Sequence, residues 1–210
     1  IMENLPADYI QMTMERLRKN GMGAFYYPTA REAAEEILRQ IPREATVGVG
    51  GSITVREMGI PEALIKRGQK VYDHWQEKTK EARTAMGRLQ QQSDYFLAST
   101  NALTLDGKLI NVDASGNRVT SMIFGPSHVI VVAGINKIVL NLEAGLARLK
   151  NIAAPKNCQR RKDSTPCALD LVCRDCESPG RLCRVTTIIE RKPYGLEQLS
   201  VYIIGEDLGY

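Results

Sequence analysis

Three observations predict a mixed α/β fold, with a mostly parallel sheet and helices on both of its faces. Helical and strand-like patterns alternate along the first hundred residues, the order expected of parallel strands joined by crossover helices. The segment 127–134 is continuously apolar, as is typical of a strand buried on both faces. The segment 102–113 carries Asp106-Gly107 between two apolar runs, which predicts an inserted hairpin.

The helical segments are recognised by apolar residues three and four positions apart, and by their caps and breakers. Thr29 and Glu32 form a capping box at the start of one helix, and Gly21 follows the end of another. Pro61 suits the first turn of a third. We therefore expect helices over 6–20, 29–41, 52–59, 61–68, 77–91 and 141–154.

The strand-like segments are short, rich in β-branched and aromatic residues, and bounded by Gly, Pro, Asn or Asp. No repeat, low-complexity segment or linker interrupts the chain, so residues 1–210 are expected to form a single domain that contains a cysteine-rich segment, 158–183. Apart from the hairpin, we expect strands over 23–28, 46–51, 70–75, 94–100, 127–134, 185–193 and 198–210.

The composition is that of a globular protein, with 43% hydrophobic and 25% charged residues in a chain of 210. No apolar run reaches the roughly 18 residues that cross a bilayer. The first residues lack a basic region followed by an apolar core, so we expect no signal peptide. These features favour a cytoplasmic protein, in which thiols stay reduced.

The net charge of +4 is concentrated in residues 156–192, where nine Lys or Arg face five Asp or Glu. A basic surface suits a small anionic ligand that carries phosphate or carboxylate. The basic segment lacks interleaved aromatic residues and any nucleic-acid-binding motif. We therefore expect no nucleic acid and no membrane among the partners; formation of a homo-oligomer stays open.

A glycine turn after a buried strand, VGVGGSIT, is the first candidate site. In α/β folds ligands bind beyond the carboxyl ends of strands, where backbone amides and hydroxyls can hold an anion. The alternative is a tight turn with a capping serine. Glu57, one turn into the helix, is a candidate catalytic carboxylate or simply a solvated one. The candidate ligand-binding residues here are Gly50, Gly51, Ser52 and Thr54.

The middle of the chain supplies a second set of small and polar residues, in the turns that flank the hairpin and at the end of the buried strand. Asp113 is a candidate general base or nucleophile. Arg118 could hold an anion through two parallel hydrogen bonds. Asx turns and caps also use such residues. The candidate ligand-binding residues are Asn101, Asn111, Asn117, Arg118, Asn136 and Lys137.

Several motifs resemble those of the lactate-utilisation domain family (LUD, formerly DUF162). They are the N-x-D-x-x-G-N-R run at 111–118, GVGGSITVREMGI at 48–60, NIAAPKN at 151–157 and the terminal GEDLGY. The resemblance extends from about residue 10 to the C-terminus. It implies the fold of ribose-phosphate isomerase, glucosamine-phosphate deaminase and the coenzyme A transferases (NagB/RpiA/CoA-transferase-like). It also implies association with bacterial iron–sulfur complexes that oxidise lactate to pyruvate.

Five cysteines gather near the C-terminus, in the order Cys158, Cys167-x5-Cys173-x2-Cys176-x6-Cys183. The last four could supply a complete thiolate shell for one metal centre. Their spacing matches neither the ferredoxin run nor two paired C-x2-C knuckles. A zinc ion and a [4Fe–4S] cluster both remain open, as do reactive thiols and structural cysteines. The metal-ligand candidates are Cys167, Cys173, Cys176 and Cys183; the role of Cys158 is undefined.

Two functions of different classes fit these residues. The first is an accessory or ligand-binding subunit of an iron–sulfur-dependent lactate oxidation system, with redox proteins as partners and a cysteine-held metal. The second is a stand-alone enzyme of the sugar-phosphate isomerase or acyl-transfer kind, acting on a small phosphorylated or CoA-linked anion. In the second, Glu57 or Asp113 would do the chemistry and the cysteines would be structural. The residues do not decide whether the protein is an enzyme.

Overall fold

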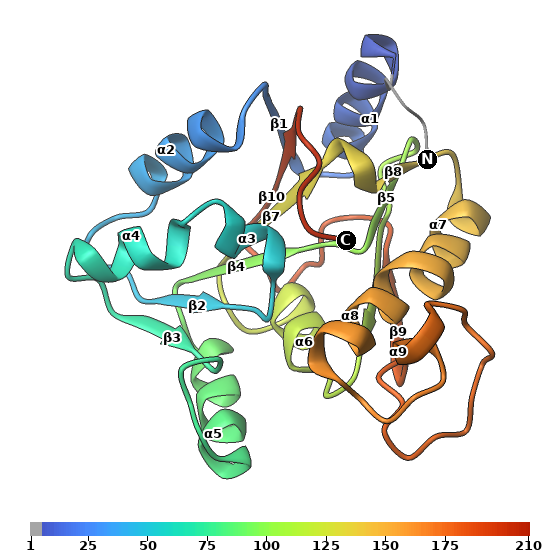
Figure 1. The fold of residues 1–210 in the computed structure, drawn as a ribbon. Helices are drawn as coiled ribbons and strands as arrows, with labels where there is room; N and C mark the ends of the chain where they lie inside the picture. The colour runs from blue at the N-terminus through green and yellow to red at the C-terminus, as the bar shows by residue number, and fades with distance from the viewer. Residues whose placement is uncertain (1–5) are drawn as a thin grey trace.

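The computed structural model describes residues 6–210 and confirms the predicted fold class. Six parallel strands form one sheet in the order β1-β10-β7-β4-β2-β3 (Figure 1). Residues 1–5, part of the stretch for which we expect no signal peptide, lie outside the described residues. The strands are β1 (Gly23–Tyr27), β2 (Val47–Val49), β3 (Val71–Asp73), β4 (Tyr95–Ser99), β7 (His128–Gly134) and β10 (Gln198–Ile204).

A helix lies close to each of the six predicted segments, and caps explain where several of them begin. The described residues also form helices over Asn117–Ile123, Ala154–Arg161 and Cys167–Asp170, which were not in the predicted set. The Thr29 hydroxyl accepts from the Glu32 amide, Ser52 from Val55, and Thr79 from Ala82. The helices are α1 (Ala7–Lys19), α2 (Ala30–Gln40), α3 (Ile53–Glu57), α4 (Ile60–Lys66), α5 (Lys80–Gln90), α6 (Asn117–Ile123), α7 (Leu142–Arg148), α8 (Ala154–Arg161) and α9 (Cys167–Asp170). A π-helical segment, Leu149–Ala153, joins α7 to α8, and a 3-10 turn, Ile135–Lys137, follows β7.

The predicted hairpin is present, and it lies in a second sheet rather than in the large one. Its strands β5 (Ala102–Thr104) and β6 (Leu109–Asp113) belong to a second sheet in the order β8-β5-β6-β9, with β8 (Ile138–Val139) and β9 (Val185–Ile189). The local signal is correct, because Gly107 adopts a φ of 79° in the turn. Which sheet a hairpin joins depends on packing that its turn does not encode.

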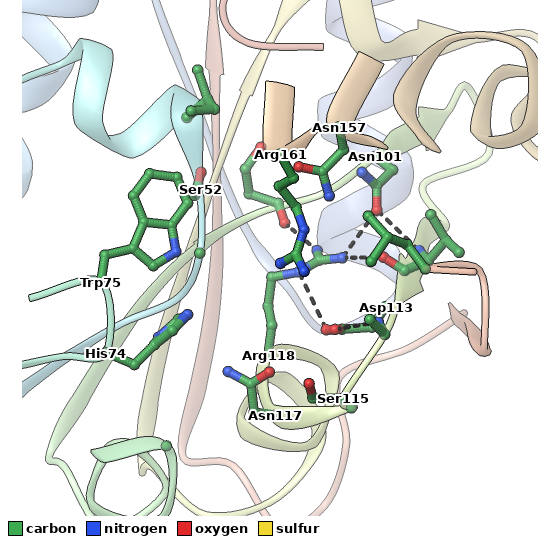
Figure 2. A pocket seen from close by; sticks show the side chains of 18 of the residues that line it. Ser52, His74, Trp75, Asn101, Asp113, Ser115, Asn117, Arg118, Asn157 and Arg161 are labelled. Carbon is green, nitrogen blue, oxygen red and sulfur yellow. Dashed lines mark hydrogen bonds and ion pairs between the residues drawn. The ribbon is translucent and has the colours of Figure 1, made fainter. Parts of the chain in front are cut away.

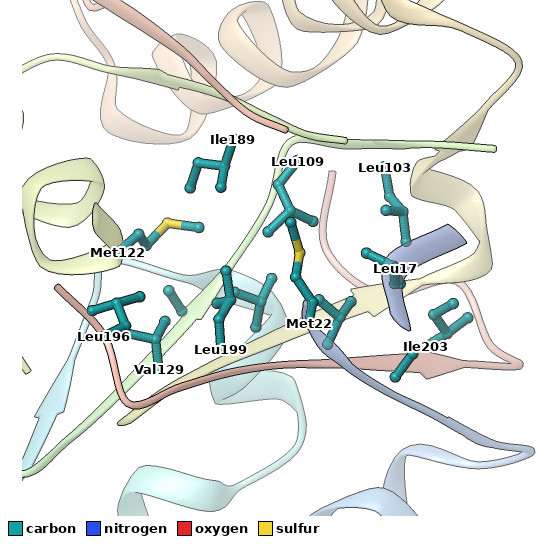
Figure 3. Packing of buried hydrophobic residues seen from close by; sticks show 14 of the residues in the cluster. Leu17, Met22, Leu103, Leu109, Met122, Val129, Ile189, Leu196, Leu199 and Ile203 are labelled. Atoms are coloured by element: carbon teal, nitrogen blue, oxygen red, sulfur yellow. The ribbon is translucent and has the colours of Figure 1, made fainter. Parts of the chain in front are cut away.

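One hydrophobic cluster fastens the two sheets together. Leu103, Leu109 and Ile189 of the small sheet pack towards Val129 and Leu199 of the large one (Figure 3). Leu17 of α1 and Met122 of α6 close its sides. The hairpin is therefore part of the core.

A second cluster covers the opposite face of the large sheet, where α2, α3 and α4 pack. Strand β10 serves both clusters: Leu199, Val201 and Ile203 face the small sheet, whereas Tyr202 and Ile204 face the helices. This alternation explains why the strand carries apolar residues on both of its faces.

The strand order reverses direction between β2 and β4. From β2 the chain proceeds outward to β3 and then returns to the other side of β2 to form β4. In open parallel sheets, ligands bind beyond the carboxyl ends of strands at such a switch point. The fold therefore indicates a binding site among the residues that follow β2, β4 and β7.

Within the described residues, no helix is both long and apolar enough to cross a membrane.

Leu109→Ala tests the cluster that joins the sheets. Leu109 is 0% exposed, so its truncation should lower the free energy of unfolding by about 2–5 kcal/mol. Leu140→Ala is the matched control, because Leu140 is 53% exposed and should give a change of less than about 1 kcal/mol. Urea unfolding of both variants measures the difference; equal effects would contradict this description of the core.

Candidate functional site

A cleft of about 660 Å³ lies at the switch point, beyond the carboxyl ends of β2 and β4. Gly51 and Ser52 follow β2. Ser99 is the last residue of β4, and Thr100 comes directly after it. Figure 2 shows His74 and Trp75 on one side of this cleft and Asp113, Asn117 and Arg118 on the other. The β6–α6 turn and α8 supply further walls.

The lining of the cleft is strongly cationic. Among the described residues, seven Lys or Arg side chains line it, against one side-chain carboxylate, that of Asp113. Five of these cations are exposed at the rim: Lys80, Arg83 and Arg88 of α5, and Arg160 and Arg161 of α8. The other two, Arg118 and Lys137, are buried at the floor. Such a charge imbalance in a concave site attracts anions.

Arg118 joins the turns around the cleft floor. Its two terminal nitrogens donate to the carbonyls of Ser99 and Val112 at 2.7 and 2.8 Å, and to the side-chain oxygens of Asn111 and Asn101 at 2.8 and 3.0 Å. Burial lowers the pKa of its guanidinium. Because both terminal nitrogens are engaged, Arg118 gives the floor positive charge rather than free donors for an anion.

Asp113 is similarly occupied. One of its carboxylate oxygens accepts from the Ala114 amide at 2.8 Å. The other accepts from the Val119 amide at 3.4 Å and lies 3.6 Å from Nε of Arg118. This carboxylate holds the β6–α6 turn in place.

Lys137 is the second buried cation, with 2% of its surface exposed. Its Nζ donates to the Thr54 hydroxyl at 2.6 Å and to the Ser99 hydroxyl at 2.8 Å. Burial, assisted by the charges of Arg148 and Arg118, lowers the pKa of the Lys137 ammonium to about 7. Near neutral pH the cleft floor therefore contains an amine that exchanges readily between its charged and neutral forms.

Arg148 lies behind Lys137 and reinforces this effect. It donates to the carbonyls of Asn136 and Asn101 at 3.1 and 2.5 Å. Burial lowers the pKa of its guanidinium to about 10. Three largely buried cations thus surround one region of the floor.

His74 and Trp75 form the opposite wall. The Gln90 amide nitrogen faces the carbonyls of Val49 and Tyr72 and lies 2.9 Å from Nδ1 of His74, so this ring nitrogen is the acceptor. The proton of the neutral ring is then on Nε2. Burial lowers the pKa of His74 and favours the neutral form.

Gly51 allows these two rings to lie close to the backbone that follows β2. A Cβ at this position would lie 3.0 Å from the indole nitrogen of Trp75 and 3.4 Å from Nε2 of His74. The Trp75 ring also lies against two guanidiniums, those of Arg56 at 4.2 Å and Arg160 at 4.8 Å from its centroid.

The C-terminal tail completes the rim. The Tyr210 hydroxyl accepts from Nε of Arg160 at 2.7 Å and lies 3.2 Å from the Asn157 side-chain oxygen. Glu57 holds the tail by accepting from the Gly209 amide at 2.7 Å. Tyr210 and Asn157 both line the cleft.

The five cysteines line one small cavity of about 30 Å³ beside the cleft, together with Arg174 and Arg181. All five are free thiols. Cys158 and Cys167 are buried, and the other three are half-buried. Leu182 and Cys183 line both this cavity and the cleft, so a single stretch of chain separates the two.

The fit of a metal to this cavity is incomplete. The donor type is right, since thiolates bind zinc and iron–sulfur clusters. Over residues 6–210, however, no three Cys, His, Asp or Glu side chains are arranged so that they could hold a metal ion. The four candidate ligands face one cavity, but their sulfur atoms do not form a coordination shell.

Comparison with known proteins identifies the family. The model of the LUD domain matches residues 10–204, which is most of the chain. The chain belongs to the LUD domain family. This confirms the resemblance seen in the N-x-D-x-x-G-N-R and GEDLGY motifs. No curated protein matches the sequence.

A solved structure supports the fold of this LUD domain. It is the crystal structure of a DUF162 family protein from Deinococcus radiodurans at 1.70 Å resolution. The two chains share 15% identity with a TM-score of 0.56, and the match covers 96% of this chain and 99% of that one. At this identity the likeness concerns the fold alone.

The structure brings most of the predicted site residues of the LUD domain into the cleft. Gly51, Ser52, Thr54, Asn101, Asp113, Asn117, Arg118 and Lys137 line it. Gly50, Glu57, Asn111 and Asn136 do not. Asn111 is buried beneath Arg118. Asn136 holds the C-terminal tail, accepting from the Leu208 amide at 3.3 Å.

Several cleft residues were missed by sequence reasoning. His74, Trp75 and the cations of α5 are not among the candidate residues named from the sequence. The signal that could have found His74 is its position, because it directly follows the carboxyl end of β3, the neighbour of β2 in the sheet. On α8, Asn157 is the last residue of the NIAAPKN motif that carries part of the family resemblance, and Arg160 lies three residues beyond it.

Lys137→Met tests the electrostatics of the floor. Between about pH 7 and the unfolded pKa near 10.5, the unfolded lysine keeps a proton that the folded one has lost, so wild-type stability should rise with pH. Methionine carries no buried charge. Below pH 7, the free energy of unfolding of Lys137→Met should therefore exceed that of wild type by about a few kcal/mol. This difference should decline as pH rises.

Chemical unfolding from about pH 6 to about pH 9 measures this trend. Lys66→Met, at an exposed position of α4, is the control and should show none. A pH-independent difference for Lys137→Met would contradict the assignment.

Proposed function

We propose that this LUD-domain protein binds a small phosphate- or carboxylate-bearing anion in the cleft, as a ligand-binding subunit of an iron–sulfur-dependent lactate oxidation system. The observation that carries the proposal is the charge imbalance: seven cationic side chains and one carboxylate line the cleft. The family membership supports the lactate-oxidation setting.

The buried cations strengthen the argument for an anion. Arg118 and Lys137 are 9% and 2% exposed, and only Arg118 has a carboxylate close to it. A cation removed from water without a counter-charge is unfavourable. An anion that enters the cleft would supply the missing charge, so part of its binding free energy comes from relieving this penalty.

The rival function, a stand-alone isomerase or acyl transferase, requires a carboxylate that can act on the substrate. Among the described residues that line the cleft, Asp113 is the single carboxylate, and both of its oxygens are engaged. Glu57 lies outside the cleft lining and binds the tail. The arrangement therefore favours anion binding over carboxylate-based acid–base chemistry.

Thermal denaturation with inorganic phosphate or with L-lactate tests the proposal and distinguishes the two anion classes. At least one should raise the melting temperature at millimolar concentration, and added salt should weaken the effect. In the double variant Arg88→Gln, Arg161→Gln, the affinity for the stabilising anion should fall about fivefold or more, because two positive charges at the rim are removed.

Arg31→Gln is the matched control, since the Arg31 side chain is 88% exposed on α2 and away from the cleft. If neither anion stabilises the protein, or if the control weakens binding as much as the double variant, the proposal fails.

A second proposal concerns the cysteines: that Cys167, Cys173, Cys176 and Cys183 hold one metal centre, either zinc or [4Fe–4S]. It is supported by the convergence of all five thiols on one cavity. Metal binding would require the cysteine-rich segment to bring its sulfur atoms closer together, because no coordination shell is present over residues 6–210. When bound, a cluster would supply electron transfer beside the cleft, and zinc would stabilise the segment.

Metal analysis of protein purified without oxygen tests the second proposal. About four irons per chain with broad visible absorption would indicate a cluster, and about one zinc a structural site. Cys176→Ser should lose most of the metal, whereas Lys66→Met should retain it. Wild-type protein that holds neither metal after anaerobic reconstitution with iron and sulfide, or with zinc, would refute it.

A further inference from the structure

The primary amine of Lys137 has chemistry that anion binding alone does not use. It comes from the 3-10 turn that follows β7, and it lines the cleft floor. Its Nζ is fixed by two hydroxyls from separate parts of the chain, Thr54 at 2.6 Å and Ser99 at 2.8 Å. The amine therefore has a defined position in the floor of a cleft large enough for a small molecule.

Lys137 has no counter-ion among the described residues. No Asp or Glu of residues 6–210 lies within ion-pair distance of its Nζ. The repulsion from Arg148 and Arg118 instead adds to the effect of burial on its pKa, and the attraction of Glu57 does not offset it. Burial beside like charges is the standard means by which proteins keep a lysine neutral and nucleophilic.

We propose that Lys137 forms an imine with a small anion that carries an aldehyde or keto group and binds in the cleft. This inference rests on the proposed function, because the cationic rim is what would bring the carbonyl compound to the amine.

The step is a condensation without change of oxidation state. The Nζ lone pair attacks the carbonyl carbon, a C–N bond forms, and the carbonyl π bond breaks as its oxygen takes a proton. The amine nitrogen loses its two protons overall, and the former carbonyl oxygen leaves as water. The Thr54 and Ser99 hydroxyls, both in contact with Nζ, are placed to relay these protons.

The alternative role for Lys137 is structural, as a link between α3 and the end of β4. A structural link needs hydrogen bonds, but it needs neither a neutral amine nor a position on the cleft surface. Covalent trapping distinguishes the two roles, because only an accessible, neutral amine forms an imine that cyanoborohydride can reduce.

The experiment uses the full chain with two probes, D-glyceraldehyde 3-phosphate and pyruvate, in the presence of sodium cyanoborohydride. The expected result is one secondary-amine adduct per chain, with a mass increase equal to the probe minus water plus two hydrogens. Peptide mapping should place the adduct on Lys137. The two probes show whether a phosphate or a carboxylate directs the reaction.

Lys137→Arg is the decisive variant, since it keeps a cation at the floor and removes the nucleophile. Its adduct should fall at least tenfold. Lys66→Arg, at an exposed position, is the control and should form the adduct as wild type does.

A pH series of the trapping rate in wild-type protein gives a readout that does not depend on how the variants fold. The rate should rise through about pH 7 and level off above it, as the ammonium loses its proton under the influence of Arg148, Arg118 and Glu57.

The possible results separate this inference from the proposed function. If the probes stabilise the protein but Lys137 is labelled no more than exposed lysines, the imine is ruled out and anion binding stands. If the probes neither bind nor label, both fail. If labelling of Lys137 persists unchanged down to pH 5 or below, or if Lys137→Arg forms the adduct as wild type does, the assignment to a neutral Lys137 amine is wrong.

Discussion

The guanidinium of Arg118 lies where the two sheets and the cleft meet, and the geometry of the site depends on it. It binds the end of β4 through Ser99 and the end of β6 through Asn111 and Val112. The hydrophobic cluster brings the sheets together, but apolar contacts set no direction. Four directed hydrogen bonds fix how the carboxyl end of one sheet faces the hairpin of the other. The cost is a charge removed from water, which one carboxylate at 3.6 Å balances only in part.

The buried charge of Arg118 affects the chemistry of the cleft as well as the fold. Because Arg118 must be charged to make its hydrogen bonds, it raises the electrostatic potential of the floor for every neighbouring group. The pKa of Lys137, which has hydroxyls rather than a carboxylate beside it, is lowered first by its burial and then by the charges of Arg148 and Arg118. An arrangement that first serves to join two sheets thus also prepares a site for negative charge and an amine with altered reactivity. Replacing Arg118 would disturb the fold and the site together, so the two roles are inseparable in this position.

Much of this could be predicted from the sequence, and the limits have physical reasons. Periodicity and capping residues such as Thr29 identify the elements, because both are local properties. Strand ends identify Ser52 and Lys137 as candidates, because parallel strands bring their carboxyl ends to one edge. The second sheet could not be predicted, since the pairing of β6 with β9 joins segments more than seventy residues apart, with no local signal. Nor could the pattern reveal that both terminal nitrogens of Arg118 are already hydrogen-bonded, or that Glu57 binds the C-terminal tail, because both depend on contacts across the fold.

Trp75 is the single tryptophan of the chain, and it lies on the cleft wall between two guanidiniums. Its fluorescence therefore originates from one place, with no second indole elsewhere to dilute the signal. The ring senses Arg160, which also binds the C-terminal tyrosine, and Arg56, which is paired with the buried Asp73. Any event that moves the rim changes the surroundings of this one chromophore. The protein thus contains its own optical probe, positioned where occupancy of the cleft can be followed in real time without a label.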